Sequence, residues 1–210
     1  MLGLLILAGG ASSRMGTDKP GVPFPDPGDP ALIRWVAAAV AKVAGPPTIA
    51  GSRDYGTGWP LVPDEAGLSG PVAGLVAGLE ASVSDLVLVL ASDLPFASPR
   101  VAQGLAELAE RELAPQAFVP ERRDQLEPLF AVYRRSAAAE LRSRARQLAQ
   151  PGHGASVHQT VAGIRLRRVT ESEWRVWDPE GLSFLNCNTP AELAKAAERA
   201  RARQVQGGTR

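Results

Sequence analysis

Short aliphatic runs of strand length alternate along this chain with longer segments whose apolar residues have helical spacing. The clearest run is DLVLVLA at residues 85–91. Such an uninterrupted run is typical of a strand that is buried on both faces. Strands that alternate with helices form a mostly parallel sheet, because each helix crosses over the sheet and covers one of its faces. The sequence therefore predicts an α/β fold of the Rossmann-like, three-layer kind.

The other expected elements continue this alternation. No internal repeat and no linker interrupts them, so we expect one domain over residues 1–205 and a flexible tail over 206–210. Residues 16–30, rich in Gly, Pro and Asp, are expected to form a mobile loop. Further strands are expected at 3–8, 48–50, 59–62, 116–119, 129–133 and 163–169, and helices at 31–43, 71–82, 98–113, 134–148 and 189–203.

Charge and composition narrow the class of protein. The formal net charge of +1 argues against non-specific nucleic-acid binding. The apolar stretches fall short of the roughly 20 residues that a membrane helix needs. Residues 1–8 lack the basic start of a signal peptide, and Cys187 is the only cysteine, which excludes a disulfide framework or a multi-cysteine metal site. We expect a cytoplasmic protein with no nucleic-acid or membrane partner.

A glycine-rich segment directly follows the first expected strand. Residues 7–19 read LAGGASSRMGTDK, with Gly9 and Gly10 at the strand end and Arg14 and Lys19 beyond them. Glycines let backbone N–H groups approach phosphate oxygens, and the two cations supply the charge that a triphosphate needs. The spacing matches neither the usual P-loop nor the dinucleotide-binding motif. The alternative is an ordinary glycine-rich turn.

Asp93 follows the most apolar expected strand, in the sequence ASDLP. Ligands of open parallel sheets bind beyond the carboxyl ends of the strands, where this carboxylate is expected. A carboxylate there is a natural ligand for Mg²⁺ that bridges to a substrate phosphate. The alternative is an aspartate that caps a turn beside a proline.

The only two asparagines, Asn186 and Asn188, lie two residues apart before the last expected helix. Their amides could hydrogen-bond a polar ligand or complete a metal's hydration shell. The alternative is that Asn188 or Thr189 caps the helix, and the spacing from Thr189 to Glu192 is that of a capping box. Cys187, between the asparagines, is expected to be a small buried residue.

Two further features leave their alternatives open. Residues 134–168 contain eight arginines and one acid, Glu140, which is compatible with a site for an anionic substrate or with a solvated basic face. His153 and His158 have no metal-ligand partners nearby in the sequence, and we interpret them as structural residues.

The segment at residues 7–19 closely resembles the molybdenum cofactor guanylyltransferases of the nucleotidyltransferase superfamily. The family pattern L-A-G-G-x-S-x-R-M-G-x-D-K is present without a gap. GPVAG at 70–74, SDLP at 92–95, EPLF at 127–130 and NCNTP at 186–190 resemble later family motifs, in the same order. The resemblance covers residues 3–195 and implies a sheet of the nucleotide-diphospho-sugar transferase type.

The resemblance also implies roles for single residues. The backbone of Leu7, Ala8 and Gly9 would contact the guanine nucleotide, with Gly10 in the same nucleotide-binding segment. Lys19 would neutralise its phosphates, and Asp64 would contact the nucleotide. Asp93 would bind Mg²⁺, and Asn186 and Asn188 would lie on the pterin side. Where family members often carry an asparagine after the second strand, this chain has AGS at 50–52.

The reaction implied is GMP transfer from GTP to the terminal phosphate of molybdopterin or the molybdenum cofactor, with release of pyrophosphate. No protein nucleophile is needed, because the attacking phosphate oxygen is already anionic. Catalysis would then rest on positioning and on charge neutralisation by Mg²⁺, Lys19 and Arg14. Proteins that supply or receive the cofactor would be transient partners. The alternatives are a cytidylyltransferase acting on the same pterin, another alcohol-phosphate nucleotidyltransferase, and a non-catalytic nucleotide-binding chaperone for the cofactor.

Overall fold

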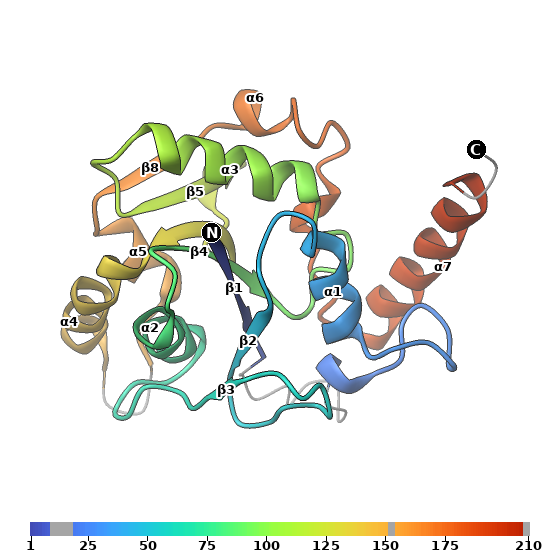
Figure 1. The fold of residues 1–210 in the computed structure, drawn as a ribbon, viewed down its shortest axis with the longest axis horizontal. Helices are drawn as coiled ribbons and strands as arrows, with labels where there is room; N and C mark the ends of the chain where they lie inside the picture. The colour runs from blue at the N-terminus through green and yellow to red at the C-terminus, as the bar shows by residue number, and fades with distance from the viewer. Residues whose placement is uncertain (9–18, 151–153, 208–210) are drawn as a thin grey trace.

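A mixed sheet of eight strands forms the centre of the computed structural model, which describes residues 1–8, 19–150 and 154–207 (Figure 1). The strands lie in the order β3-β2-β1-β4-β7-β5-β6. The remaining strand, β8, pairs with β5 on the edge opposite β7. This confirms the predicted α/β class. The strands are β1 (Leu2–Leu7), β2 (Pro47–Ala50), β3 (Leu61–Val62), β4 (Leu86–Ala91), β5 (Ala117–Arg122), β6 (Gln125–Leu126), β7 (Phe130–Arg134) and β8 (Leu166–Val169).

Helices cover both faces of this sheet, and Figure 1 shows α3 and α2 on opposite sides of it. None of the helices in the described part of the chain is long and apolar enough to cross a membrane. The helices are α1 (Leu32–Val40), α2 (Pro71–Ala81), α3 (Pro99–Arg111), α4 (Ala138–Leu148), α5 (Val157–Ala162), α6 (Glu171–Trp174) and α7 (Pro190–Gly207), with short 3₁₀ turns η1 (Lys19–Gly21), η2 (Arg135–Ala137) and η3 (Leu182–Phe184).

Strand alternation divides the core into two layers. On β1, Leu4 and Ile6 belong to the apolar cluster that includes residues of α1 and α3, whereas Leu5 and Leu7 belong to the cluster that includes residues of α2 and α4. The central strand β4 alternates in the same way. Successive side chains of a strand point to opposite faces, so a strand covered on both faces must be apolar throughout.

β7 and the two-residue β6 depart from the parallel arrangement: β7 runs antiparallel to both β4 and β5, and β6 runs antiparallel to β5. The chain passes from β5 through the two-residue strand β6 to β7 without a crossover helix. Arg123 and Asp124 turn this connection with φ values of 49° and 62°. A connection this short can join only antiparallel strands, which explains the reversed strand.

Several elements differ from those expected. The two-residue strand β6 was not predicted, and β8 begins at Leu166 instead of residue 163. Residues 134–137 belong to β7 and η2, so α4 begins at Ala138 instead of Arg134. The short helices α5 and α6 were not predicted. Both carried a local signal: the Ser156 side chain accepts a hydrogen bond from the Gln159 amide, and Thr170 and Glu173 form a capping box. These helices span six and four residues, too short for their apolar spacing to be recognised.

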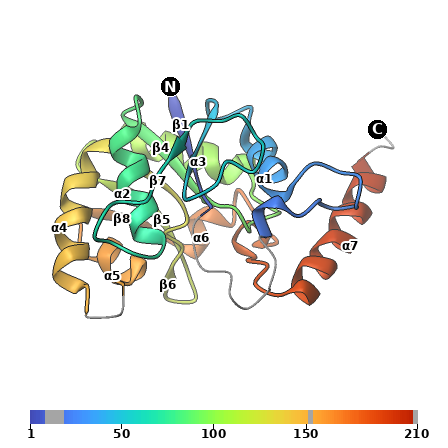
Figure 2. The same cartoon turned by 90° about the horizontal axis from the view of Figure 1, so that it is seen from below.

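The proline-rich segment after η1 is anchored, in contrast to the expected mobile loop. Phe24 is 1% exposed and packs edge-on against Trp35 at 5.2 Å. Asp26 pairs with Arg201 of α7 at 2.8 Å. Figures 1 and 2 both show α7 at the periphery beside this segment. Residues 16–18 of that loop, and 208–210 of the predicted tail, lie outside the described residues.

Candidate functional site

The carboxyl ends of β1 and β4 lie side by side and place the candidate residues. Leu7 is paired with Ala91 at the ends of the two strands. The Ser92 amide donates to the Leu7 carbonyl at 3.1 Å, so the chain that leads to Asp93 stays beside β1 for one more residue. Asp93 therefore lies just beyond the sheet edge at which ligands of open parallel sheets bind.

Lys19 joins three segments that are far apart in the sequence. Its ammonium donates to the Cys187 carbonyl oxygen at 2.9 Å and to Asn188 Oδ1 at 3.4 Å. It also lies 3.5 Å from Asp93 Oδ2. The structure thus brings together three residues that the sequence analysis had singled out separately: Lys19, Asp93 and Asn188.

This pair of charges is largely shielded from water. The Lys19 and Asp93 side chains are 13% and 22% exposed. Burial raises the pKa of Asp93 above its ordinary value, and the neighbouring positive charge of Lys19 lowers it again only in part. A carboxylate that is desolvated and incompletely neutralised favours the arrival of a further cation.

The segment after η3, which contains Cys187, is hydrogen-bonded to the backbone of Asp93. The Cys187 amide donates to the Asp93 carbonyl at 3.1 Å. Cys187 itself is fully buried, which confirms the expectation, and burial together with the Asp93 charge raises the pKa of its thiol to about 11. A thiol with so high a pKa is protonated at neutral pH and is a poor nucleophile.

The start of α7 is capped by Thr189 and Glu192, as the sequence spacing predicted. The Glu192 carboxylate accepts hydrogen bonds from the amides of Asn188 and Thr189, at 2.7 and 2.8 Å. Thr189 Oγ1 accepts from the Glu192 amide at 3.2 Å. The side chain of Asn188 is therefore not needed as the cap, and its oxygen faces Lys19. Asn186 is exposed.

Asp64 lies on another side of the strand ends. Its carboxylate is 3.0 Å from the position that a Cβ would take on Gly74, which is also close to Leu7 and Ala50. Gly74 therefore makes room for this carboxylate over the ends of β1 and β2. Partial burial raises the pKa of Asp64. Asp64 therefore lies over the ends of β1 and β2 near Leu7, whereas Asp93 lies at the end of β4 near Lys19.

The backbone around Ala8 is held by protein groups. The Ala8 amide donates to the Ala50 carbonyl at 2.9 Å. The Ala8 carbonyl accepts a hydrogen bond from the Tyr55 hydroxyl at 3.0 Å. Tyr55 could not be recognised from the sequence, because its only signal there is its place in a loop after a strand. The predicted site residues Gly9, Gly10 and Arg14, and also His153, lie outside the described residues.

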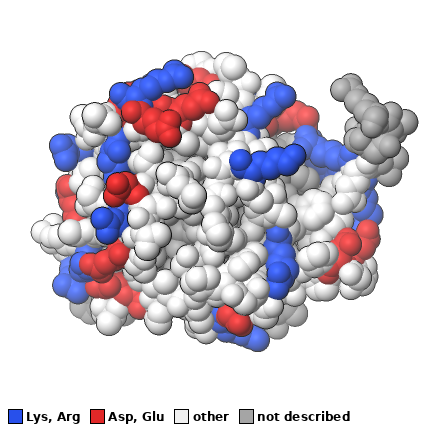
Figure 3. Space-filling view, in the orientation of Figure 1, with Lys and Arg blue, Asp and Glu red and all other residues white. Residues whose placement is uncertain are grey.

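The arginines of residues 134–168 are largely engaged within the protein. Arg134 donates to the carbonyls of Ala109 and Glu112 at the end of α3, and to that of Pro115. Arg142, Arg146, Arg167 and Arg168 form ion pairs with glutamates. Figure 3 shows both signs of charge close together around the edge of one face, with a largely uncharged centre. These contacts give the segment a structural role.

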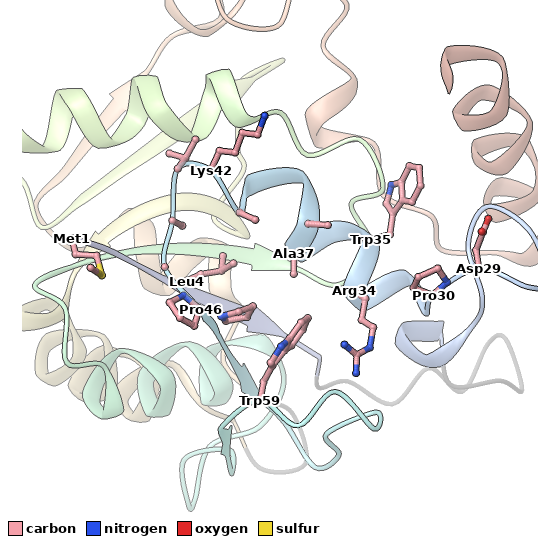
Figure 4. A pocket seen from close by; sticks show the side chains of 16 residues that line it. Met1, Leu4, Asp29, Pro30, Arg34, Trp35, Ala37, Lys42, Pro46 and Trp59 are labelled. Atoms are coloured by element: carbon pink, nitrogen blue, oxygen red, sulfur yellow. The ribbon is translucent and has the colours of Figure 1, made fainter. Parts of the chain in front are cut away.

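A cavity of about 880 Å³ lies between α1 and the start of β1 (Figure 4), and neither Lys19 nor Asp93 lines it. Its lining includes Met1, Leu4 and Trp59, and the Arg34 guanidinium lies 5.6 Å from the Trp59 ring. None of the predicted site residues lines it. We assign it no part in the candidate site.

Side chains of the described residues do not by themselves form a metal cage. Among residues 1–8, 19–150 and 154–207, no group of three or more His, Cys, Asp or Glu could hold a metal ion. Mg²⁺ differs from zinc in this respect, since it commonly binds one or two carboxylates together with substrate phosphates and water. The partly desolvated Asp93 carboxylate fits that requirement.

A sheet covered on both faces, with a lysine and a carboxylate beyond its carboxyl edge, is typical of nucleotide-binding α/β proteins. Residues 4–164 match the family described as MobA-like NTP transferase domain, and the chain belongs to that family. It is therefore a nucleotidyltransferase.

Similar proteins match this chain over nearly its whole length. A protein of Chloroflexus aggregans named "Probable molybdenum cofactor guanylyltransferase" is 32% identical over 207 residues, covering 92% of each chain. One of the same name from Pelotomaculum thermopropionicum is 32% identical over 195 residues, covering 91% of this chain and 90% of that one.

Solved structures support the fold. Molybdopterin-guanine dinucleotide biosynthesis protein A from Archaeoglobus fulgidus superposes with a TM-score of 0.78 at 25% identity, covering 96% of this chain and all of that one. The 2-C-methyl-D-erythritol 4-phosphate cytidylyltransferase from Thermus thermophilus reaches a TM-score of 0.65 at 22% identity, covering 95% and 98%. The latter shows only that the fold is shared.

The raised pKa of Asp93 predicts how its substitution affects stability. At neutral pH the charged form of Asp93 is less favourable in the folded protein than in water. With a chelator present to remove metal ions, Asp93→Asn should therefore raise the melting temperature by up to a few degrees and should not lower it. The difference should shrink as the pH falls through the raised pKa, because the wild-type carboxyl then becomes neutral too.

Thermal melts of both proteins at pH 7 and pH 4 measure this effect. Asp85→Asn is the matched control, since Asp85 is 93% exposed and its pairing with Arg135 is screened by water. A lower melting temperature for Asp93→Asn at pH 7 would contradict the prediction.

Proposed function

We propose that this enzyme transfers GMP from GTP to the terminal phosphate of molybdopterin or the molybdenum cofactor, releasing pyrophosphate. The observation that carries the proposal is the shielded Lys19–Asp93 pair, 3.5 Å apart at the sheet edge, with Asn188 beside it. Relatives that span 90% or more of this chain are named molybdenum cofactor guanylyltransferases. Together they support a role in molybdenum cofactor biosynthesis, which we place in the cytoplasm.

The proposed chemistry needs little from the protein beyond placement and charge. A phosphate oxygen of the acceptor attacks the α-phosphorus of GTP; a new P–O bond forms there and the bond to pyrophosphate breaks. Lys19 binds the triphosphate and offsets the negative charge that concentrates on it. Asp93 would hold Mg²⁺, which supplies a second positive charge at the phosphates when it is bound.

The acceptor side is assigned to Asn186 and Asn188. Asn188 shares the Lys19 ammonium, so an acceptor bound there lies next to the phosphate-binding cation. Asn186 is exposed two residues earlier, on the same side of the chain if this segment is extended. Holding the two reactants in line converts a bimolecular reaction into one within a complex. Leu7, Ala8 and Asp64 would contact the nucleotide on the other side.

Pyrophosphate release tests the activity directly. The purified protein is incubated with GTP, CTP, ATP or UTP and Mg²⁺, with and without the pterin acceptor. We expect release only with the acceptor, and fastest with GTP. Faster release with CTP would make this a cytidylyltransferase on the same pterin, and release with a sugar phosphate instead of the pterin would reassign the acceptor.

Substituting Lys19 separates its phosphate contact from its structural contacts. Lys19→Met keeps much of the side-chain length but removes the charge, and catalytic efficiency with GTP should fall by about 100-fold or more. Lys42→Met is the matched control, because Lys42 is exposed just after the end of α1 and lines the separate cavity instead of the candidate site. Steady-state kinetics with melting temperatures as a folding check measure both. Unchanged efficiency in folded Lys19→Met would remove Lys19 from the site.

Asp93→Asn should reduce turnover by two or more orders of magnitude, since asparagine keeps the size but loses the charge that binds a hard cation. Raising the Mg²⁺ concentration should recover part of the rate, whereas raising GTP alone should not. The Asp85→Asn protein serves again as the control. If Asp93 only caps a turn, asparagine replaces it almost silently, and near-normal pyrophosphate release would reject the metal assignment.

A further inference from the structure

The loop between β2 and β3 holds a tyrosine in a backbone conformation that bulky residues rarely adopt. Tyr55 has φ of 55°, in the left-handed region. Gly56 and Gly58 in the same loop also have positive φ, 65° and 74°, but glycine adopts such values without steric cost. A tyrosine occupies a position where glycine would be free of strain, which indicates that its side chain is used.

Hydrogen bonds around Tyr55 maintain this conformation. Asp54 accepts from the amide of Gly56 through its side chain, at 3.1 Å, and from the amide of Thr57 through its carbonyl, at 3.0 Å. The Thr57 hydroxyl donates to the same carbonyl at 2.7 Å. Arg34 of α1 donates to the Gly56 carbonyl at 2.8 Å. The loop is therefore determined by several bonds that do not involve the Tyr55 side chain.

The Tyr55 side chain connects two parts of the candidate site. Its hydroxyl donates to the Ala8 carbonyl at 3.0 Å, at the end of β1. Its ring packs against η1, with Cδ1 3.5 Å from the position of a Cβ on Gly21. The Arg53 guanidinium lies 5.8 Å from the ring centroid. One side chain thus joins the end of β1 to the turn that begins with Lys19.

We propose that Tyr55 is a positioning residue for nucleotide binding, which holds the Ala8 carbonyl through its hydroxyl and the Lys19 turn through its ring. The inference rests on the proposed function, in which Ala8 contacts the nucleotide and Lys19 its phosphates. The Lys19 ammonium contacts Cys187, Asp93 and Asn188, whereas the Tyr55 ring lies against the same turn at Gly21. A small displacement of a binding group weakens binding, so both supports affect affinity.

Two substitutions separate the two contacts. Tyr55→Phe removes the hydroxyl bond and keeps the ring, whereas Tyr55→Leu removes both. The probes are Mg·GTP and inorganic tripolyphosphate, each titrated by calorimetry. Tyr55→Phe should weaken Mg·GTP by roughly fivefold, the worth of one hydrogen bond, and leave tripolyphosphate unchanged. Tyr55→Leu should weaken both. In turnover, KM for GTP should rise with little change in kcat.

Tyr133→Phe is the matched control. Its hydroxyl also donates to a backbone carbonyl, that of Pro128 at 2.8 Å, but in the fully buried core. This variant should lose thermal stability and keep its affinity for both probes. Tyr55→Phe should show the opposite pattern, with its melting temperature nearly unchanged.

The outcomes distinguish the two proposals. Wild-type protein that binds neither probe would overturn the proposed function and this inference with it. If the wild type binds and Tyr55→Phe binds Mg·GTP equally well, the hydroxyl has no positioning role. If Tyr55→Leu binds tripolyphosphate equally well, the ring does not support Lys19. If Tyr133→Phe also loses affinity, the effect of the Tyr55 substitutions reflects a general loss of stability, and the positioning role is rejected.

Discussion

The ammonium of Lys19 is the group on which the arrangement of the candidate site depends. It is shared by the Asp93 carboxylate, the Cys187 carbonyl and the Asn188 amide oxygen. These partners lie 74 or more residues along the chain from Lys19. One cation therefore ties the turn after the glycine-rich segment, the end of β4 and the start of α7 into a single site. Water is partly excluded, so each of these interactions is stronger than it would be at the surface.

The same shielding makes the site costly to the fold. Asp93 is held where its charge is disfavoured, and Lys19 offsets that cost only in part. Sites that bind charged ligands often carry such a cost, because the free energy is recovered when the ligand or metal arrives. The arginines of the chain and Lys19 have different roles. Arg134, Arg142 and Arg167 cap helix carbonyls or pair with glutamates, while a lysine faces the predicted phosphate site.

Prediction from sequence succeeded where structure is local. β4 and β1 are recognisable because burial on both faces requires apolar residues throughout, and the Thr189–Glu192 cap is recognisable because its partners are three residues apart. It recognised β7 as a strand at 129–133 but did not predict its reversed direction, and it placed the start of α4 at Arg134 instead of Ala138. There, residues 134–137 carry no pattern that distinguishes a strand end from a helix start. Pairing with Leu86 of β4 decides that Arg134 is in a strand.

The sequence by itself determined the fold class, the family motifs and the chemical type of each candidate residue, because hydrophobic periodicity and short-range spacing express them. Only the tertiary structure decided which of those residues meet. It placed Asn188 beside Lys19, paired the basic segment with glutamates, and brought Tyr55 to the carbonyl of Ala8. Those contacts join residues up to 169 positions apart, and they form only when the packing of helices on the sheet brings distant loops to one edge.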